Sequence, residues 1–83
     1  MSLEYSDGTI RLLGNCTLEE AEMLLQLLLD HPGAVVDWSD CSGLHGAVLQ
    51  TLMAGRRRMV GEPADEFLRR WMAPALMIHT NSR

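Results

Sequence analysis

The side chains best suited to chemistry lie close together, between residues 37 and 45. This stretch contains two aspartates, two serines, a cysteine and a histidine, namely Asp37, Ser39, Asp40, Cys41, Ser42 and His45. A cysteine near a histidine can form a nucleophile and base pair, and an imidazole can accept a phosphoryl group. Such a pair also needs an orienting group and an oxyanion site, and the spacing matches no catalytic motif. We therefore expect no catalytic residue, and the alternative is a small hydrolase or phosphotransfer protein that uses His45 or Cys41.

The sequence gives little support to a metal or cofactor site. Its two cysteines, Cys16 and Cys41, are far apart and lack the CxxC or Cys/His spacing of a zinc site. A GxxxxGK phosphate-binding signature is absent as well. We expect no metal and no cofactor, and we interpret both cysteines as small buried hydrophobes. For His45 we favour a helix cap or a half-buried polar residue over a chemical role.

A short strand and a helix must position this polar stretch. The segment Ala34–Val36 is too short and too β-branched for a helix, whereas Leu44, Val48 and Leu52 recur at helical spacing. The pattern predicts a strand, then a polar loop, then a helix over about His45–Met59. Loops at the carboxyl ends of strands are where open α/β sheets bind ligands and partners. The chemistry-bearing stretch is expected to occupy such a loop.

Local signals also predict the elements of the first third of the chain. The segment Leu3–Gly14 reads as two short strands around an Asp-Gly turn, which is a strong hairpin signal. Thr17 and Glu20 match a capping box that begins a helix, and Asp30–Gly33 ends it. The expected core stripe of this helix is apolar and broad: Leu18, Ala21, Leu25 and Leu28, widened by Leu24, Leu27 and Leu29. A face of this width either packs against the sheet or meets another chain.

The last third of the chain predicts one more helix. Gly61–Pro63 forms a break, and a helix follows over residues 64–72 until Pro74. Its apolar side would consist of Phe67, Leu68, Trp71 and Met72. Residues 75–78 form a last short strand or the tail of this helix, and residues 79–83 a frayed end. The whole pattern predicts a single α/β domain over residues 1–83, a small sandwich of about four strands with helices packed mainly on one face.

Composition narrows the range of partners. The net charge is −4, with 11 acidic residues against 7 basic ones, which argues against nucleic acid because phosphate contacts need clustered positive charge. The one basic cluster, Arg56–Arg58, is interpreted as the solvated end of a helix. Apolar runs such as Leu27–Leu29 are far below the length that spans a membrane, and the first residues lack a leader pattern. We expect a cytoplasmic protein without direct membrane insertion.

Two segments resemble the STAS domain, the family of sulfate transporters and anti-sigma factor antagonists. Val35–Ser39 is similar to the strand of that family that ends in Val-Val-Asp-Leu-Ser, and Gly8–Gly14 followed by a helix is similar to its first strands and first helix. The resemblance covers about Leu3–Met59. It implies a non-catalytic module that docks a loop and the following helix against a regulatory protein: a kinase, a sigma regulator or a transporter subunit. A soluble accessory subunit of a membrane transporter is the alternative within this class.

The resemblance also implies which residues dock and which could be phosphorylated. The docking residues would be Asp37, Trp38, Ser39, Asp40, Leu44, His45, Gly46 and Gln50. Aligned without gaps, the phosphoacceptor position of the family falls at Gly46 and Ala47, which carry no hydroxyl. With a shortened loop, Ser42 takes that position; we favour the ungapped alignment.

Three further expectations concern the same region and its neighbours. The backbone amides of Gly46, Ala47 and Val48 would be free to attract an acidic group at the helix start. The strand that the family has between its last two helices looks missing from Arg56–Gly61. A homodimer through the leucine-rich first helix or through a sheet edge is compatible with every version.

Overall fold

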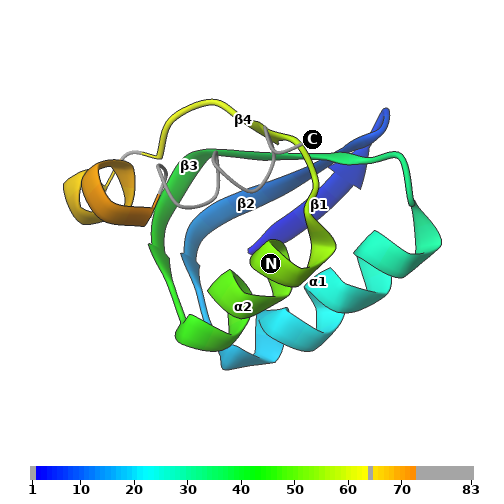
Figure 1. Ribbon diagram of the computed structural model, residues 1–83, viewed down its shortest axis with the longest axis horizontal. Helices are drawn as coiled ribbons and strands as arrows, with labels where there is room; N and C mark the ends of the chain where they lie inside the picture. The colour runs from blue at the N-terminus through cyan, green and yellow to red at the C-terminus, as the bar shows by residue number, and fades with distance from the viewer. Residues whose placement is uncertain (1, 64, 73–83) are drawn as a thin grey trace.

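A computed structural model describes residues 2–63 and 65–72 of this chain (Figure 1). The elements follow one another as two strands, a helix, a strand, a helix, a short strand and a helical turn. Their bounds are β1 Leu3–Ser6, β2 Thr9–Cys16, α1 Leu18–Asp30, β3 Val35–Leu44, α2 Gly46–Gly55, β4 Met59–Val60 and the π-helical turn η1 Leu68–Met72. No helix within these described residues is long and apolar enough to cross a membrane.

The hairpin at the N-terminus follows from its turn residues. Asp7 and Gly8 both adopt positive φ, 51° and 76°, between the paired residues Ser6 and Thr9. Two consecutive residues with positive φ produce the turn whose twist matches that of antiparallel strands. The predicted hairpin is therefore confirmed.

The four strands form one mixed sheet in the order β1-β2-β3-β4. β1 pairs with β2 in antiparallel orientation, whereas β2 with β3 and β3 with β4 are parallel. The two parallel crossovers carry α1 and α2, and Figure 1 shows these helices side by side on the same side of the sheet. This arrangement confirms the predicted α/β fold with a four-stranded sheet.

A single core lies between the sheet and the two helices. Its buried side chains are Leu3, Ile10, Leu12, Cys16, Leu24, Leu28, Ala34, Val36, Trp38, Cys41, Val48, Leu52, Met59 and Leu68. Alternate residues of β2 and β3 contribute to it, as expected for a sheet with one covered face. The core therefore anchors β3, the strand that carries the polar stretch.

Helix α1 begins where the sequence predicts but buries a different face. The carboxylate of Glu20 accepts hydrogen bonds from the backbone N–H of Thr17 at 2.7 Å and from its hydroxyl at 2.8 Å. The prediction that Leu18 and Leu25 belong to the core stripe was wrong, since they are 57% and 50% exposed. Leu24 and Leu28 are buried instead, with Ala21 and Leu27 packed against the core. Because leucines lie on both flanks of the buried face as well as on it, their spacing alone does not identify that face.

The region between residues 37 and 60 differs from the sequence prediction in three ways. The expected loop is mostly strand, because β3 continues to Leu44. Helix α2 ends at Gly55 rather than Met59, since Arg56 adopts the left-handed conformation (φ 52°) and its N–H bonds Leu52 O at 3.1 Å. Met59 and Val60 then form β4 beside β3, so the strand between the last two helices is present.

The arginine cluster and the last turn also differ from what the sequence predicts. Arg57 is not a solvated helix end: its Nη2 donates to Leu28 O at 2.8 Å and its Nη1 to His31 O at 3.4 Å, which caps α1. Leu68 is buried as expected, but Phe67 is 56% exposed because the turn places these neighbours on different sides. The side chains of Trp71 and Met72, the possible strand 75–78 and the tail 79–83 lie outside the described residues.

Candidate functional site

The polar stretch forms the carboxyl-terminal half of β3, and two bulges shape it. Between the paired positions Arg11↔Asp37 and Leu13↔Asp40, β3 contains one residue more than β2. A second extra residue, Ser42, lies between Cys41 and Gly43, whose partners on β2 follow each other directly. Each bulge turns an additional side chain outward. Ser39, Asp40 and Ser42 are all exposed as a result, while Trp38 and Cys41 point into the core.

One edge of this half-strand has no strand partner in the described part of the chain, and at its beginning Gly61 lies against Ser39. β4 pairs only with Val36 and Asp37, whereas β2 follows β3 as far as Leu44. Within residues 2–63 and 65–72, the segment Ser39–Leu44 therefore pairs on one side only. Unpaired backbone donors and acceptors at a sheet edge can accept a strand from another chain.

A local network fixes the carboxylate at the start of this edge. Oδ1 of Asp37 accepts hydrogen bonds from the Ser39 hydroxyl at 2.6 Å and from the Ser39 backbone N–H at 2.9 Å. These two bonds, with a smaller contribution from Arg11 on β2, lower the pKa of Asp37 below its usual value. The carboxylate therefore keeps its negative charge, and the Ser39 N–H is already occupied before any partner arrives.

His45 caps the helix that follows. It is the N-cap of α2, with extended backbone, and its Nδ1 accepts a hydrogen bond from Ala47 N–H at 3.0 Å. The structure thus confirms the cap that we favoured over a chemical role. The backbone N–H of Val48 bonds His45 O at 2.9 Å, so two of the three amides expected to be free are occupied and Gly46 alone keeps that role. An anion at this helix start is correspondingly less supported.

Three of the expected docking residues are not presented with the others: Trp38 and Leu44 lie on β3 but pack into the core, and Gln50 lies on α2. Trp38 is 1% exposed, and its Nε1 donates to Gly61 O at 3.1 Å, so it belongs to the core and cannot offer apolar contact to a partner in this structure. Leu44 is half-buried and packs against the core. Gln50 lines a groove between α1 and α2, away from the β3 edge. The sheet edge and the helix start bring together the remaining five: Asp37, Ser39, Asp40, His45 and Gly46.

The cysteines do not form an accessible nucleophile. Cys16 and Cys41 are both free and fully buried, which confirms their interpretation as small buried hydrophobes. A hydrogen bond with Cys41, together with burial, raises the pKa of the Cys16 thiol well above its usual value. Thiols in such surroundings are inert, because the reactive species is the exposed thiolate.

Sequence reasoning missed two neighbours of the site. Asn15 on β2 lies beside Gly43, where an added Cβ would come within 2.5 Å of Asn15 Oδ1. The parallel pairing of β2 with β3, which places the carboxyl ends of both strands together, was the signal for Asn15. Gly61 (φ 80°) lies against Ser39, so an added Cβ would overlap the Ser39 hydroxyl. No local signal pointed to this contact.

Neither a metal cluster nor a relative identifies the site. Among the described residues, no three histidine, cysteine or carboxylate side chains gather in a way that could hold a metal ion. No model of a known protein family, no curated protein and no solved structure matches this chain. The function of this protein must therefore be inferred from the geometry of the β3 edge and the start of α2.

Proposed function

We propose that this protein is a non-catalytic protein-interaction module that docks a regulatory protein at the carboxyl-terminal half of β3 and the start of α2. The observation that carries the proposal is the open edge Ser39–Leu44, which presents exposed Ser39, Asp40 and Ser42. Backbone groups of such an edge supply affinity through added strand hydrogen bonds, and the side chains supply selectivity.

The charge of the edge defines the kind of partner. Asp37 and Asp40 place two carboxylates within four residues of the same strand, and the chain as a whole carries a net charge of −4. A partner segment with basic side chains would gain complementary contacts there and would be steered toward the edge. Since Trp38 and Cys41 anchor β3 in the core, the edge is already formed before binding. Binding to a preformed edge loses less conformational entropy than ordering a loop.

The STAS-like character of the module stays part of the proposal. The element order strand-strand-helix-strand-helix-strand and the presence of β4 between α2 and η1 support it. Under this proposal the partner is a cytoplasmic kinase, a sigma regulator or a transporter subunit. Ser42 is exposed on the edge, so its phosphorylation would add a charge of about −2 directly at the docking surface.

Affinity capture from a lysate of the native host tests the proposal. The bait is the full chain, and the matched variants are Asp40→Ala on the edge and Glu4→Ala, an equally exposed acid on β1. We expect the Asp40→Ala bait to capture about tenfold less partner than the unmodified chain, which corresponds to about 1.4 kcal/mol of binding free energy. The Glu4→Ala bait should capture as much partner as the unmodified chain. Equal loss with both variants, or with neither, would reject the β3 edge as the docking surface.

A further inference from the structure

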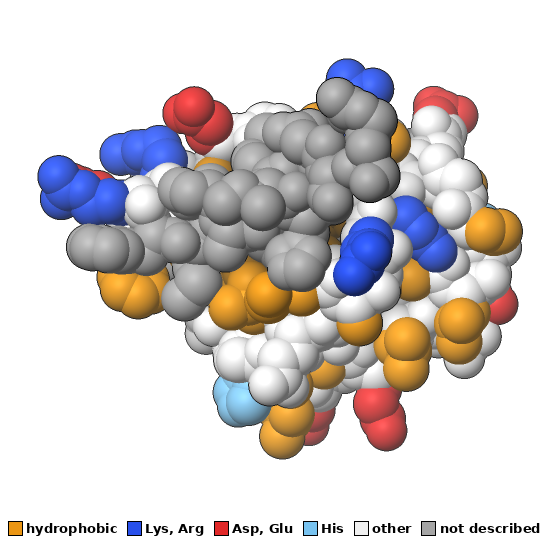
Figure 2. Space-filling model, viewed as in Figure 1, with side chains coloured by type: hydrophobic (Ala, Val, Ile, Leu, Met, Phe, Trp, Pro, Cys, Tyr) orange, Lys and Arg blue, Asp and Glu red, His pale blue; other side chains and the backbone are white. Residues whose placement is uncertain are grey.

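An apolar surface lies on the flank of α1 that faces α2. Leu18, Leu25 and Leu29 of α1 are 57%, 50% and 66% exposed and fall on one stripe of the helix, spaced seven and four residues apart. We refer to these three residues as the leucine ridge. Figure 2 shows apolar side chains gathered over α1, with arginines beside the end of α2 and acidic side chains along the lower border. Large exposed leucines at helical spacing mark an interface rather than ordinary surface.

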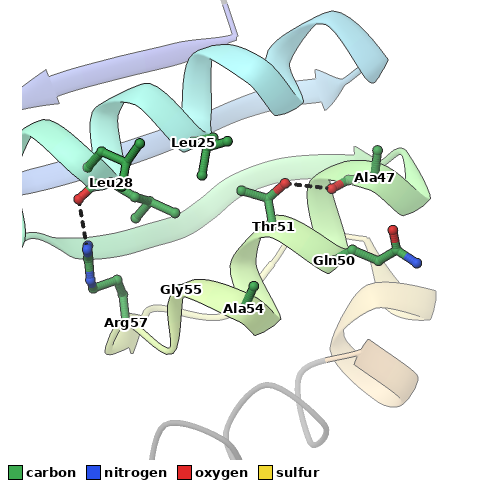
Figure 3. Close-up of a pocket in the computed structure, with 9 residues that line it drawn as sticks. Leu25, Leu28, Ala47, Gln50, Thr51, Ala54, Gly55 and Arg57 are labelled. Atoms are coloured by element: carbon green, nitrogen blue, oxygen red, sulfur yellow. Dashed lines mark hydrogen bonds between the residues drawn. The ribbon is translucent and has the colours of Figure 1, made fainter.

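A groove of about 610 Å³ runs along the ridge, between α1 and α2. Figure 3 shows Leu25 and Leu28 on its α1 side and mostly small side chains on its α2 side. The α2 side consists of Ala47, Gln50, Thr51, Ala54 and Gly55. The hydroxyl of Thr51 donates to Ala47 O at 2.8 Å, within its own helix. The groove therefore has room for leucine side chains and few polar groups that need a partner.

The two ends of this face carry opposite charges. Arg57 bonds the carbonyl of Leu28, which places the C-terminal ends of α1 and α2 side by side. The exposed Arg56 and Arg58 follow directly, whereas Glu19 and Glu22 are exposed near the other end of α1. Asp30 also lies at the arginine end and offsets part of its positive charge. Its Oδ1 accepts a hydrogen bond from Gln26 Nε2 at 3.0 Å.

We propose that this face is where two copies of the chain associate as a two-fold symmetric dimer. The α1 helices of the two copies run antiparallel, and the leucine ridge of each copy occupies the groove of the other. A two-fold interface must be self-complementary, and this face meets that condition twice. The face combines the leucine ridge with the groove that Leu25 and Leu29 themselves line. In the antiparallel arrangement, the acidic end of one copy would also face the arginine end of the other. Charge complementarity thus favours a second copy over a partner of unrelated sequence.

Sedimentation equilibrium of the full chain over a concentration series tests the dimer. The variant Leu25→Ser/Leu29→Ser removes the ridge without touching buried side chains, and Ala54→Arg fills the groove from α2 at an exposed position. We expect each to raise the dimer dissociation constant at least tenfold, because the leucine variant removes apolar contact from the interface and Ala54→Arg places a bulky charged side chain in the groove. Phe67→Ser is the matched control, since Phe67 is also 56% exposed but lies outside the groove. The control should leave the dissociation constant unchanged.

Charge reversal tests the antiparallel arrangement. Glu22→Arg alone or Arg58→Glu alone should weaken the dimer, whereas the double reversal in one chain should restore it, because each acidic end then meets a basic end again. A wild-type chain that stays monomeric at hundreds of micromolar overturns the proposal. A dimer that keeps its dissociation constant in both the leucine and the Ala54→Arg variants overturns it too. Circular dichroism of every variant ensures that a loss of dimer is not a loss of fold.

Discussion

Trp38 and Asp40 lie two positions apart on β3 and have opposite roles. Trp38 is buried and bonds Gly61 O, whereas Asp40 is exposed on the open edge. We expect Trp38→Phe to lower the free energy of unfolding by about 1–3 kcal/mol, since it loses the indole hydrogen bond and part of the core volume. Asp40→Ala should change the free energy by less than about 0.5 kcal/mol. Urea unfolding followed by circular dichroism measures both, and equal effects would contradict the assignment of these residues to core and edge.

The carboxylate of Asp37 makes stability depend on pH. Its pKa is lowered in the folded chain, so its contribution is present above the unfolded pKa of about 3.9 and is lost as the pH falls through the lower folded value. We expect Asp37→Asn to lower the free energy of unfolding at pH 7 by about 0.5 kcal/mol, a small effect because solvent screens the half-exposed group. The difference in the free energy of unfolding should shrink as the pH falls below about 3.9, because the folded carboxyl is then progressively protonated as well.

At the element scale, β4 depends on a glycine that approaches β3 closely. Gly61 has φ 80°, and an added Cβ would overlap the Ser39 hydroxyl, whereas Gly8, with φ 76°, has open space at the same position. Gly8→Ala should therefore cost about 1 kcal/mol for its backbone conformation alone, and Gly61→Ala clearly more. Combining Gly61→Ala with Ser39→Ala should recover part of the excess. Thermal unfolding of the three variants tests this, and equal losses for the two single glycine variants would contradict the close contact.

The start of α2 depends on the His45 cap. We expect His45→Ala to lower the free energy of unfolding by about 1 kcal/mol, because the Ala47 N–H loses its acceptor, whereas His45→Asn should retain most of the stability. Urea unfolding distinguishes the two. Equal losses would show that the imidazole acts in another way. The asparagine variant is also the better choice in binding experiments, since it removes the ring while keeping the helix start.

The sequence predicted those elements whose signals are local. The Asp7-Gly8 turn, the Glu20 carboxylate at the start of α1 and the His45 cap depend on neighbours within three residues. The length of β3 could not be predicted, because two bulges let it follow β2 to Leu44 through a polar sequence. The buried face of α1 could not be predicted either, since packing against distant elements decides that Leu24 rather than Leu25 is buried. Within the candidate site, the burial of Trp38 could not be predicted either, since it depends on the contact with the distant Gly61, and the docking roles of the site residues stay predictions.

For the whole molecule, the fold separates two surfaces that need not compete. The open β3 edge lies on the sheet, and the leucine ridge with its groove lies on the helices. A dimer through the helices would therefore carry two copies of the edge, and a bivalent partner would bind with an increased effective concentration. The proposed function depends on the β3 edge and not on the dimer.

The most direct measurement places a photo-crosslinking amino acid at Ser42 and, as a control, at Glu4, both exposed positions of the same sheet. Each full-length bait is irradiated in a lysate of the native host, and its adducts are identified by mass spectrometry. We expect the crosslinker at position 42 to give a discrete protein adduct that the additional Asp40→Ala substitution abolishes. The crosslinker at position 4 should give no such adduct. The same adduct from both positions, or an adduct from position 42 that Asp40→Ala leaves intact, would contradict docking at the β3 edge.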